Sequence, residues 1–247
     1  AGVEHSFFIP HLGQLSDLCQ IIYVDHRGNG RSDDGDPSTW TLAQWGDDVA
    51  GLCDVLGIAR PIIYGASFGG YVAQSFATRH PERLSGLILS VTAAKVDFEQ
   101  VFAAFTRIGG AQAGEVARIY WSDPSPERRQ AYFDTCLPLY SVTGLDPDMM
   151  ARMIVKNPVA MHFNGPKNEQ GRFDFRSDLA NVPCPALVIA GDQDPIMPYA
   201  FGAEIAQHLP DARYHLLENA GHTVDFDATD AFYTLMRGFI EKVSHAA

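Results

Sequence analysis

Residues 61–70 read Pro-Ile-Ile-Tyr-Gly-Ala-Ser-Phe-Gly-Gly, a short apolar run that leads directly into a serine flanked by small residues. The run predicts a buried strand, and the spacing of Tyr71, Val72 and Phe76 after it predicts a helix. A G-x-S-x-G pattern between a strand and a helix is typical of a nucleophile elbow, in which a sharp turn lifts the serine hydroxyl above the sheet edge. Ser67 is therefore the candidate nucleophile.

The residue after the serine has a role of its own in this geometry. The backbone N–H of Phe68 opens the predicted helix, where it can donate to the oxyanion of a tetrahedral intermediate. Loss of such a donor typically costs about 10²–10³ in rate. A G-x-S-x-G match alone is weak evidence because glycine and serine are common, so the assignment depends on partners elsewhere in the chain.

A serine hydroxyl needs a base to accept its proton. Among the nine histidines, His222 follows a predicted strand within the small-residue turn Ala-Gly-His, near the carboxyl end of the chain. His162, in the helical middle of the chain, is the one competing histidine, and we interpret it as a substrate contact. His222 is the candidate base.

The base in turn needs a carboxylate that fixes the tautomer of its imidazole. Asp194 lies just beyond a predicted strand, in the loop Gly-Asp-Gln-Asp-Pro, and is the candidate acid. Asp192 in the same loop and Asp97 after the preceding strand remain as alternatives. Asp225 and Asp227 follow the histidine too closely and are interpreted as solvated turn residues. The resulting order of serine, aspartate and histidine is the one expected with this elbow.

The fold class follows from the alternation of two patterns along the chain. Five apolar runs are predicted as strands: 20–25, 61–66, 84–92, 185–191 and 213–218. Helical patterns separate them, including a helix at 42–56 with a Thr-Leu-Ala-Gln start and a glycine stop. We therefore predict an α/β fold, with a mostly parallel sheet flanked by helices.

One long segment interrupts the alternation. From about residue 93 to residue 178, helical patterns continue without a convincing strand. A helical block between two strands of one sheet indicates a cap over the carboxyl edge of that sheet. The predicted domains are an α/β core, 1–92 and 179–247, and an inserted helical cap, 93–178.

Composition excludes several classes of function. The chain has 247 residues and a formal net charge of −12, which repels nucleic acid and anionic membranes. No apolar stretch reaches the roughly 18 residues of a membrane span. Four cysteines without a C-x-x-C pair favour a reducing, cytoplasmic location. No metal cluster or phosphate-binding loop is visible, so we predict no metal and no cofactor, and the oligomeric state stays open.

Taken together, these segments resemble the α/β-hydrolase superfamily, and within it the chain is similar to the proline iminopeptidase-like branch. The stretch Asp-His-Arg-Gly-Asn-Gly-Arg-Ser at 25–32 resembles the family's D-x-R-G-x-G-x-S loop. The loops at 191–195 and 220–222 resemble its acid and base loops. We interpret 25–32 as a structural loop in which Arg27 anchors backbone near the elbow. The match covers nearly the whole chain outside the cap.

Two departures from the family qualify this resemblance. The family's sheet begins with about three strands before the one expected at residue 20, and a His-Gly-rich loop supplies the second oxyanion donor. The resemblance therefore implies roughly 25 to 40 residues ahead of Ala1. Phe68 replaces the tryptophan that is usual after the nucleophile in iminopeptidases, and Gly-Ala-Ser-Phe-Gly is similar to esterase-like relatives.

We predict a hydrolase that acts by acyl transfer on a small-molecule or short-peptide substrate with an ester or amide bond. The alternatives are a carboxylesterase, a lactonase or a carbon–carbon bond hydrolase with the same triad, and a non-catalytic ligand receptor on the same fold. The substrate is expected to lie under an aromatic cap. Besides His162, the candidate substrate contacts are Phe98, Phe102, Tyr120 and Trp121.

Overall fold

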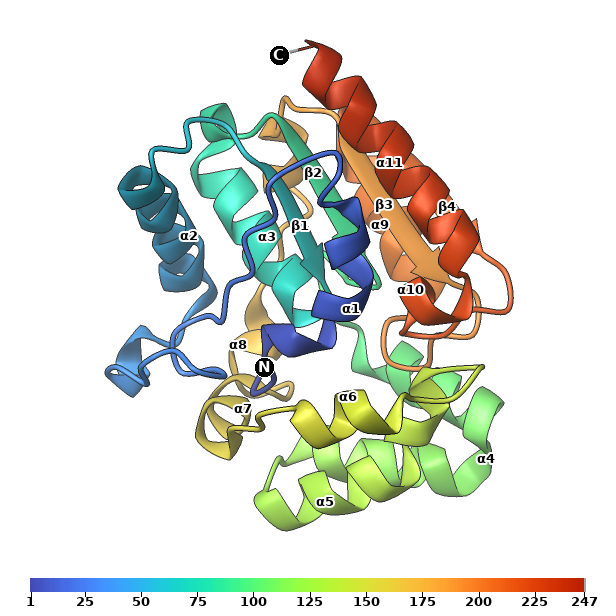
Figure 1. Ribbon diagram of the computed structural model, residues 1–247. Helices are drawn as coiled ribbons and strands as arrows, with labels where there is room; N and C mark the ends of the chain where they lie inside the picture. The colour runs from blue at the N-terminus through green and yellow to red at the C-terminus, as the bar shows by residue number, and fades with distance from the viewer. Residues whose placement is uncertain (247) are drawn as a thin grey trace.

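A sheet of four parallel strands forms the centre of the computed structural model, which describes residues 1–246 except for the side chains of Met149 and Ala246. In spatial order the strands are β1 (Ile62–Ala66), β2 (Gly86–Ser90), β3 (Ala186–Gly191) and β4 (Ala212–Leu217) (Figure 1). These strands confirm four of the five predicted runs. The two central strands are buried at every residue, as their continuous apolar sequence requires.

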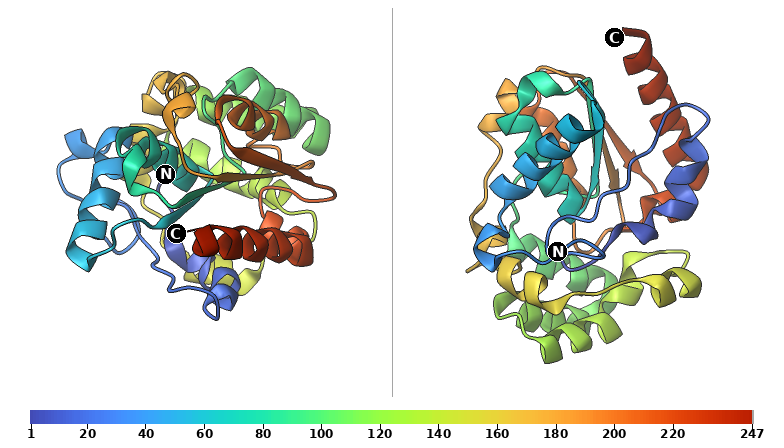
Figure 2. Two further views of the ribbon diagram at one scale, coloured as in Figure 1. Left: turned by 90° about the horizontal axis from the view of Figure 1, so that it is seen from above. Right: turned by 60° about the vertical axis from the view of Figure 1, so that its left-hand side comes forward.

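Helices cover both faces of the sheet (Figure 2). Helix α3 (Phe68–Arg79) and helix α9 (Tyr199–His208) pack on one face, where Phe76 and Ile205 are fully buried among strand residues. Helix α11 (Thr229–Ala246) packs on the other face through Phe232 and Met236. The predicted α/β class is confirmed, because each central strand is apolar on both sides and needs a helix on each.

Helix α2 (Leu42–Leu56) packs on α3 and has the predicted start and stop. The Thr41 hydroxyl accepts from the backbone N–H of Gln44 at 3.2 Å, and Gly57 ends the helix in the left-handed conformation with φ 68°. The remaining elements of the core are short: α1 (Ile9–Leu12), α10 (Val224–Asp227) and the 3₁₀ turns His5–Phe7, Gly13–Leu15, Pro37–Thr39, Pro81–Arg83 and Asp178–Asn181.

Five helices lie between β2 and β3 in sequence and beyond the carboxyl ends of the strands in space (Figure 1). They are α4 (Phe98–Ser122), α5 (Pro126–Thr135), α6 (Pro147–Arg152), α7 (Asn157–Phe163) and α8 (Glu169–Arg172), with a 3₁₀ turn at Leu137–Tyr140. Helix α4 bends at Gly110, where φ is 79°. We refer to these helices as the cap; its boundaries at residues 93 and 178 stay a prediction.

The strand predicted at 20–25 is wrong. These residues are extended, but they join no ladder, and the sheet begins at β1. Residues 20–25 and β1 are both among the residues that line a cavity of about 640 Å³. A strand is defined by hydrogen bonds to a neighbour, and here the backbone polar groups of the two segments do not meet.

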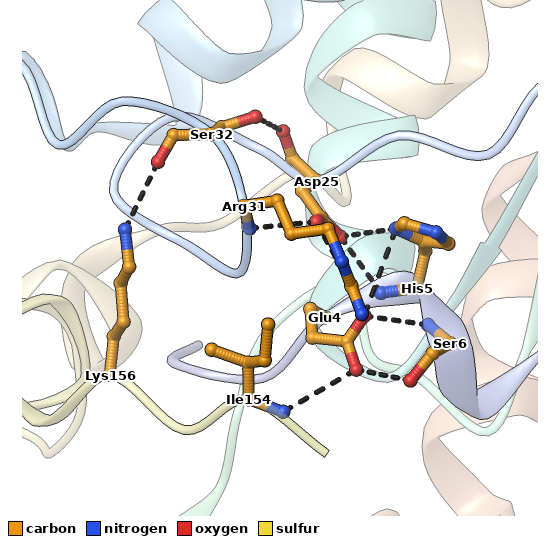
Figure 3. A network of polar contacts seen from close by, with 8 residues as sticks. All are labelled: Glu4, His5, Ser6, Asp25, Arg31, Ser32, Ile154 and Lys156. Atoms are coloured by element: carbon orange, nitrogen blue, oxygen red, sulfur yellow. Dashed lines mark hydrogen bonds and ion pairs between the residues drawn. The ribbon is translucent and has the colours of Figure 1, made fainter. Parts of the chain in front are cut away.

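The loop at 25–32 has the structural role that its sequence predicted. Asp25 accepts hydrogen bonds from the backbone N–H groups of His5 and Arg31, at 2.8 and 2.9 Å, and Arg31 pairs with Glu4 (Figure 3). The ligand atoms of Glu4, His5 and Asp25 lie within 4.8 Å of one another, but each side chain is already hydrogen-bonded. We interpret this cluster as a polar network that fixes the loop.

The anchoring role expected of Arg27 is met in a different way. Its guanidinium forms a two-pronged ion pair with Asp48 of α2, at 2.6 and 2.7 Å, and its carbonyl accepts from the indole N–H of Trp45.

Among the helices that the structure describes, none is both long and apolar enough to cross a membrane.

Candidate active site

The turn from β1 to α3 has the geometry of a nucleophile elbow. Ser67 has φ 52° and ψ −121°, a strained conformation for a residue with a side chain, and α3 begins at the next residue. Small neighbours make the turn possible: a Cβ on Gly65 would lie 2.4 Å from the carbonyl oxygen of Gly69, and one on Gly70 would lie 2.4 Å from the Thr92 hydroxyl. The predicted strand, turn and helix are confirmed.

Phe68 opens helix α3, so its backbone N–H has no carbonyl of a preceding turn to bond. Its side chain is fixed by edge-to-face contacts with the rings of Trp45, at 5.0 Å, and Phe163, at 5.2 Å. These contacts hold the first turn of α3 against α2 and the cap. The role of Phe68 as an oxyanion donor stays a prediction.

His222 and Asp194 meet at the carboxyl edge of the sheet. His222 follows β4 and Asp194 follows β3, and the imidazole Nδ1 lies 2.7 Å from the carboxylate Oδ2. The other carboxylate oxygen accepts from the backbone N–H groups of Ile196 and Met197, both at 2.9 Å. Asp194 is fully buried, and these bonds leave its carboxylate one orientation, toward the histidine.

Ser67 and His222 line the same cavity of about 640 Å³. Within residues 1–246, the Ser67 hydroxyl makes no hydrogen bond to the protein, and none joins it to the His222 ring. Ser67 is positioned by its backbone instead, since its N–H donates to the Ser90 carbonyl at 3.0 Å and its carbonyl accepts from Thr92. The structure therefore brings the three predicted residues to one edge of the sheet.

The alternative carboxylates have other partners. Asp97 caps the start of α4, where it accepts from the N–H groups of Glu99 and Gln100. Asp192 accepts from the N–H of Ala220, at 3.2 Å, and so supports the loop that carries the histidine. Neither pairs with an imidazole among the described residues.

The interpretation of Asp225 and Asp227 as solvated turn residues is wrong. Asp225 is only 4% exposed, and its Oδ2 is buried without a partner. Asp227 is half-buried and accepts from the N–H of Gly221 at 2.8 Å and from the Ser141 hydroxyl at 2.7 Å. Contacts from the cap contribute to the burial of Asp227, since Ser141 and Thr143 donate to it, and the local sequence does not record such contacts.

The predicted substrate contacts divide into two groups. Tyr120 and Trp121 line the cavity that contains Ser67, whereas Phe98, Phe102 and His162 are not among its lining residues. Phe98 and Phe102 pack together within the cap, with ring centroids 6.2 Å apart. His162 packs edge-on against Trp40 at 5.6 Å and lines a separate pocket of about 600 Å³.

Sequence reasoning missed the arginine that lines the cavity. Arg129 of α5 lines it and is 4% exposed. The available signal was helical spacing, because Tyr132, Phe133 and Cys136 follow Arg129 at intervals of three, four and seven and predict that it lies on the apolar face. Its neighbour Arg128, by contrast, pairs with Asp123 at the surface.

Comparison with known proteins agrees with the fold. The model of the alpha/beta hydrolase fold family matches residues 2–229. The chain is 27% identical to a Caulobacter protein named "Putative carbamate hydrolase RutD", over 97% of this chain and 87% of the relative. It is 28% identical to a proline iminopeptidase of Pestalotiopsis fici, over 97% and 88% of the two chains.

A solved structure extends the comparison. The enol-lactonase of Burkholderia xenovorans is 27% identical, with a TM-score of 0.68, and the match covers 97% of this chain and 88% of that one. These relatives confirm the iminopeptidase-like relationship expected from the sequence and are named as hydrolases of different bonds. The chain is thus a hydrolase, and it belongs to the alpha/beta hydrolase fold family.

Proposed function

We propose that this enzyme is a serine hydrolase that cleaves an ester or amide bond through Ser67, His222 and Asp194. The observation that carries the proposal is the 2.7 Å hydrogen bond between His222 and the buried Asp194, at the cavity that Ser67 also lines. A buried carboxylate holds the imidazole in the tautomer whose free Nε2 can take a proton, which is what a serine nucleophile needs.

The reaction then takes two steps. Ser67 attacks the carbonyl carbon while His222 accepts the hydroxyl proton, and the Phe68 N–H stabilises the oxyanion of the tetrahedral intermediate. When the intermediate collapses, the bond from the carbonyl carbon to the leaving group breaks, His222 gives its proton to the leaving group, and the acyl group stays on the Ser67 oxygen. Water, deprotonated by His222, releases the acid and restores the serine.

The cap favours an ester over a peptide with a free amino terminus. An iminopeptidase must hold the substrate's ammonium group, which requires carboxylates close to the cleaved bond. The acidic side chains of α4 and α5 are exposed and none lines the cavity: Glu99, Glu115, Asp123, Glu127 and Asp134. Of the carboxylates that do line it, Glu4 pairs with Arg31, Asp25 accepts from the N–H of His5, and Asp225 is buried. We therefore place carboxylesters and lactones ahead of iminopeptides as substrates, although relatives of both kinds exist.

Two assays test this function. A fluorophosphonate should label the wild-type chain once, at Ser67, and should fail to label Ser67→Ala. Short p-nitrophenyl esters assayed beside a proline arylamide then separate the substrate classes, with faster turnover expected for the esters. A folded wild-type chain that neither labels nor turns over any substrate would favour the alternative of a ligand receptor on the same fold.

The expected setting of the enzyme is also a proposal. We infer a small-molecule substrate, no nucleic-acid or membrane partner and a cytoplasmic location, on the grounds of the negative net charge and the cysteine pattern. All four cysteines are free in the fold, three of them buried. Fractionation of cells that express the native protein would test the location.

A further inference from the structure

Tyr140 of the cap is fixed at three points beside the candidate base. Its carbonyl accepts from the backbone N–H groups of His222 and Thr223, at 2.6 and 3.3 Å. Its ring lies edge-on to the imidazole, with centroids 5.0 Å apart, and its hydroxyl lies 2.5 Å from that of Tyr132. A side chain held at its backbone, its ring and its end loses little freedom when a substrate binds, which is the condition for a preorganised catalytic group.

The Tyr140 side chain also reaches the space where a substrate would bind. It lines the cavity that Ser67 and His222 line, and it remains partly exposed, whereas Tyr132 is 1% exposed. In acyl transfer, the base that takes the serine proton next gives it to the leaving group, so the leaving-group oxygen lies beside the imidazole. A donor that packs on the imidazole is therefore placed for the leaving group, whereas the Phe68 N–H is placed for the oxyanion.

The two tyrosine hydroxyls have two protons, and the hydrogen bond between them uses one. Burial raises the pKa of both hydroxyls well above the ordinary value of 10, so both keep their protons near neutral pH. The negative charge of Asp194 also acts on Tyr140, and such a charge attracts the hydrogen end of an O–H group. This favours the arrangement in which Tyr132 donates to Tyr140 and Tyr140 keeps its own proton for another acceptor. Among the described residues, no other hydrogen bond involves the Tyr140 hydroxyl.

We propose that Tyr140 is a further catalytic residue, whose hydroxyl donates a hydrogen bond to the leaving-group oxygen while the bond from that oxygen to the carbonyl carbon breaks. No covalent bond to Tyr140 forms or breaks, and His222 still gives the leaving group its proton. The hydrogen bond stabilises the negative charge that develops on the leaving-group oxygen in the transition state. This proposal rests on the proposed function, because it requires acyl transfer to Ser67.

The competing explanation is structural: the hydroxyl pair of Tyr132 and Tyr140 packs the cap against the loop that carries His222 and does nothing more. Removal of the Tyr140 hydroxyl would then displace the imidazole and slow every substrate alike. A donor to the leaving group matters most where the leaving group is most basic, because more charge develops on its oxygen. The two explanations therefore differ in how the loss depends on the leaving group.

The test measures kcat/KM of wild type and Tyr140→Phe on acetate esters with increasingly basic leaving groups: p-nitrophenyl, p-chlorophenyl, phenyl and ethyl acetate. The substitution removes the hydroxyl and keeps the ring and the carbonyl that hold His222. The loss should be about 10- to 100-fold on ethyl acetate, as expected for a hydrogen bond to a charged group, and less than about threefold on p-nitrophenyl acetate. Tyr214→Phe is the matched control, because its hydroxyl donates to the Tyr199 carbonyl outside the cavity, and it should leave all the rates unchanged.

An equal loss on all the esters in Tyr140→Phe, or no loss on any, would overturn the proposal. A selective loss in Tyr132→Phe that is absent in Tyr140→Phe would also overturn it, because the free proton would then belong to Tyr132. Fluorophosphonate labelling recognises a failure of the proposed function separately. Fluoride is a weakly basic leaving group, so Tyr140→Phe should label at Ser67 as fast as wild type. A wild-type chain that does not label would refute the proposed function, whereas normal labelling with an equal loss on all the esters would refute only the role of Tyr140.

Discussion

The backbone N–H of His222 donates to the carbonyl oxygen of Tyr140 at 2.6 Å, so the candidate base is held by a residue of the cap. The Tyr140 ring also lies edge-on to the imidazole, with centroids 5.0 Å apart. Asp227 reinforces this contact from the other side, because it accepts from Gly221 before the histidine and from Thr143 of the cap. The position of the imidazole therefore depends on the cap being packed against the loop that carries His222.

Ser67→Ala should lower kcat by about 10³–10⁶ and leave the melting temperature unchanged. The nucleophile is lost, but the hydroxyl makes no hydrogen bond to the described part of the protein, so the fold loses nothing. Steady-state kinetics and thermal unfolding check both parts. Ser244→Ala, on an exposed site of α11, is the matched control. A variant that keeps a tenth of the activity would exclude Ser67 as the nucleophile.

Asp194→Asn should lower kcat by about 10³–10⁴, because an amide that donates to Nδ1 stabilises the wrong imidazole tautomer. Asp192→Asn changes the other carboxylate of the same loop, whose contact is with the N–H of Ala220, and should cost less than about tenfold. Kinetics of the two variants side by side identify the acid. The opposite ranking would assign the role to Asp192.

Asp227→Asn should lower both stability and kcat/KM. The carboxylate joins the base loop to the cap by several hydrogen bonds, and losing part of this set should cost about 1–3 kcal/mol. Urea unfolding and ester kinetics measure the two effects. Asp230→Asn, three residues on and exposed, is the control. Full activity in Asp227→Asn would show that the cap does not need this contact to position the histidine.

The Asp227 carboxylate should also make the stability of the fold depend on pH. Burial acts to raise the pKa of Asp227, but the N–H groups of Gly221 and Thr143 and two hydroxyls outweigh it, so the pKa lies below the ordinary value of 3.8. A lowered folded-state pKa means that this stabilisation is present above about pH 4 and is lost as the pH falls further. The stability difference between wild type and Asp227→Asn should therefore shrink on acidification below pH 4.

Asp225 should make the stability of the fold decrease as the pH rises, which is the opposite of the pH dependence expected from Asp227. Burial, followed by the neighbouring charge of Asp227, raises the pKa of Asp225 from 3.8 to about 6. The folded state therefore holds this proton more tightly than the unfolded chain, and stability is lost as the pH rises from about 4 to about 6. Asp225→Asn removes the charge and should be more stable than wild type at pH 7.5, by up to about 3 kcal/mol. Urea unfolding at pH 4 and pH 7.5 measures this. Equal stability of the two proteins at pH 7.5 would contradict the raised pKa.

Much of the fold was predictable because its signals are local. The apolar runs of β1 to β4, the Thr41 start and Gly57 stop of α2, and the strand–turn–helix around Ser67 depend on neighbouring residues only. The loops that carry Asp194 and His222 could be placed at one edge because parallel strands end on the same side of a sheet. For these features, sequence order and the periodicity of apolar residues were sufficient.

The rest was decided by packing between segments distant in the chain. The sequence of 20–25 has the composition of a strand, yet strand pairing requires a neighbour within reach, and none of the strands β1 to β4 pairs with it. Local sequence likewise does not reveal that the side chains of Asp225 and Arg129 are buried.

The sequence by itself determined the class of fold and the candidate nucleophile, base and acid, since each follows from a local pattern and from chain order. Only the tertiary structure decided which charges are buried, which of them lack partners and which cap residue holds His222. The physical reason is that the cost of a buried charge depends on everything within a few ångströms of it, and in a folded chain most of those neighbours come from remote positions.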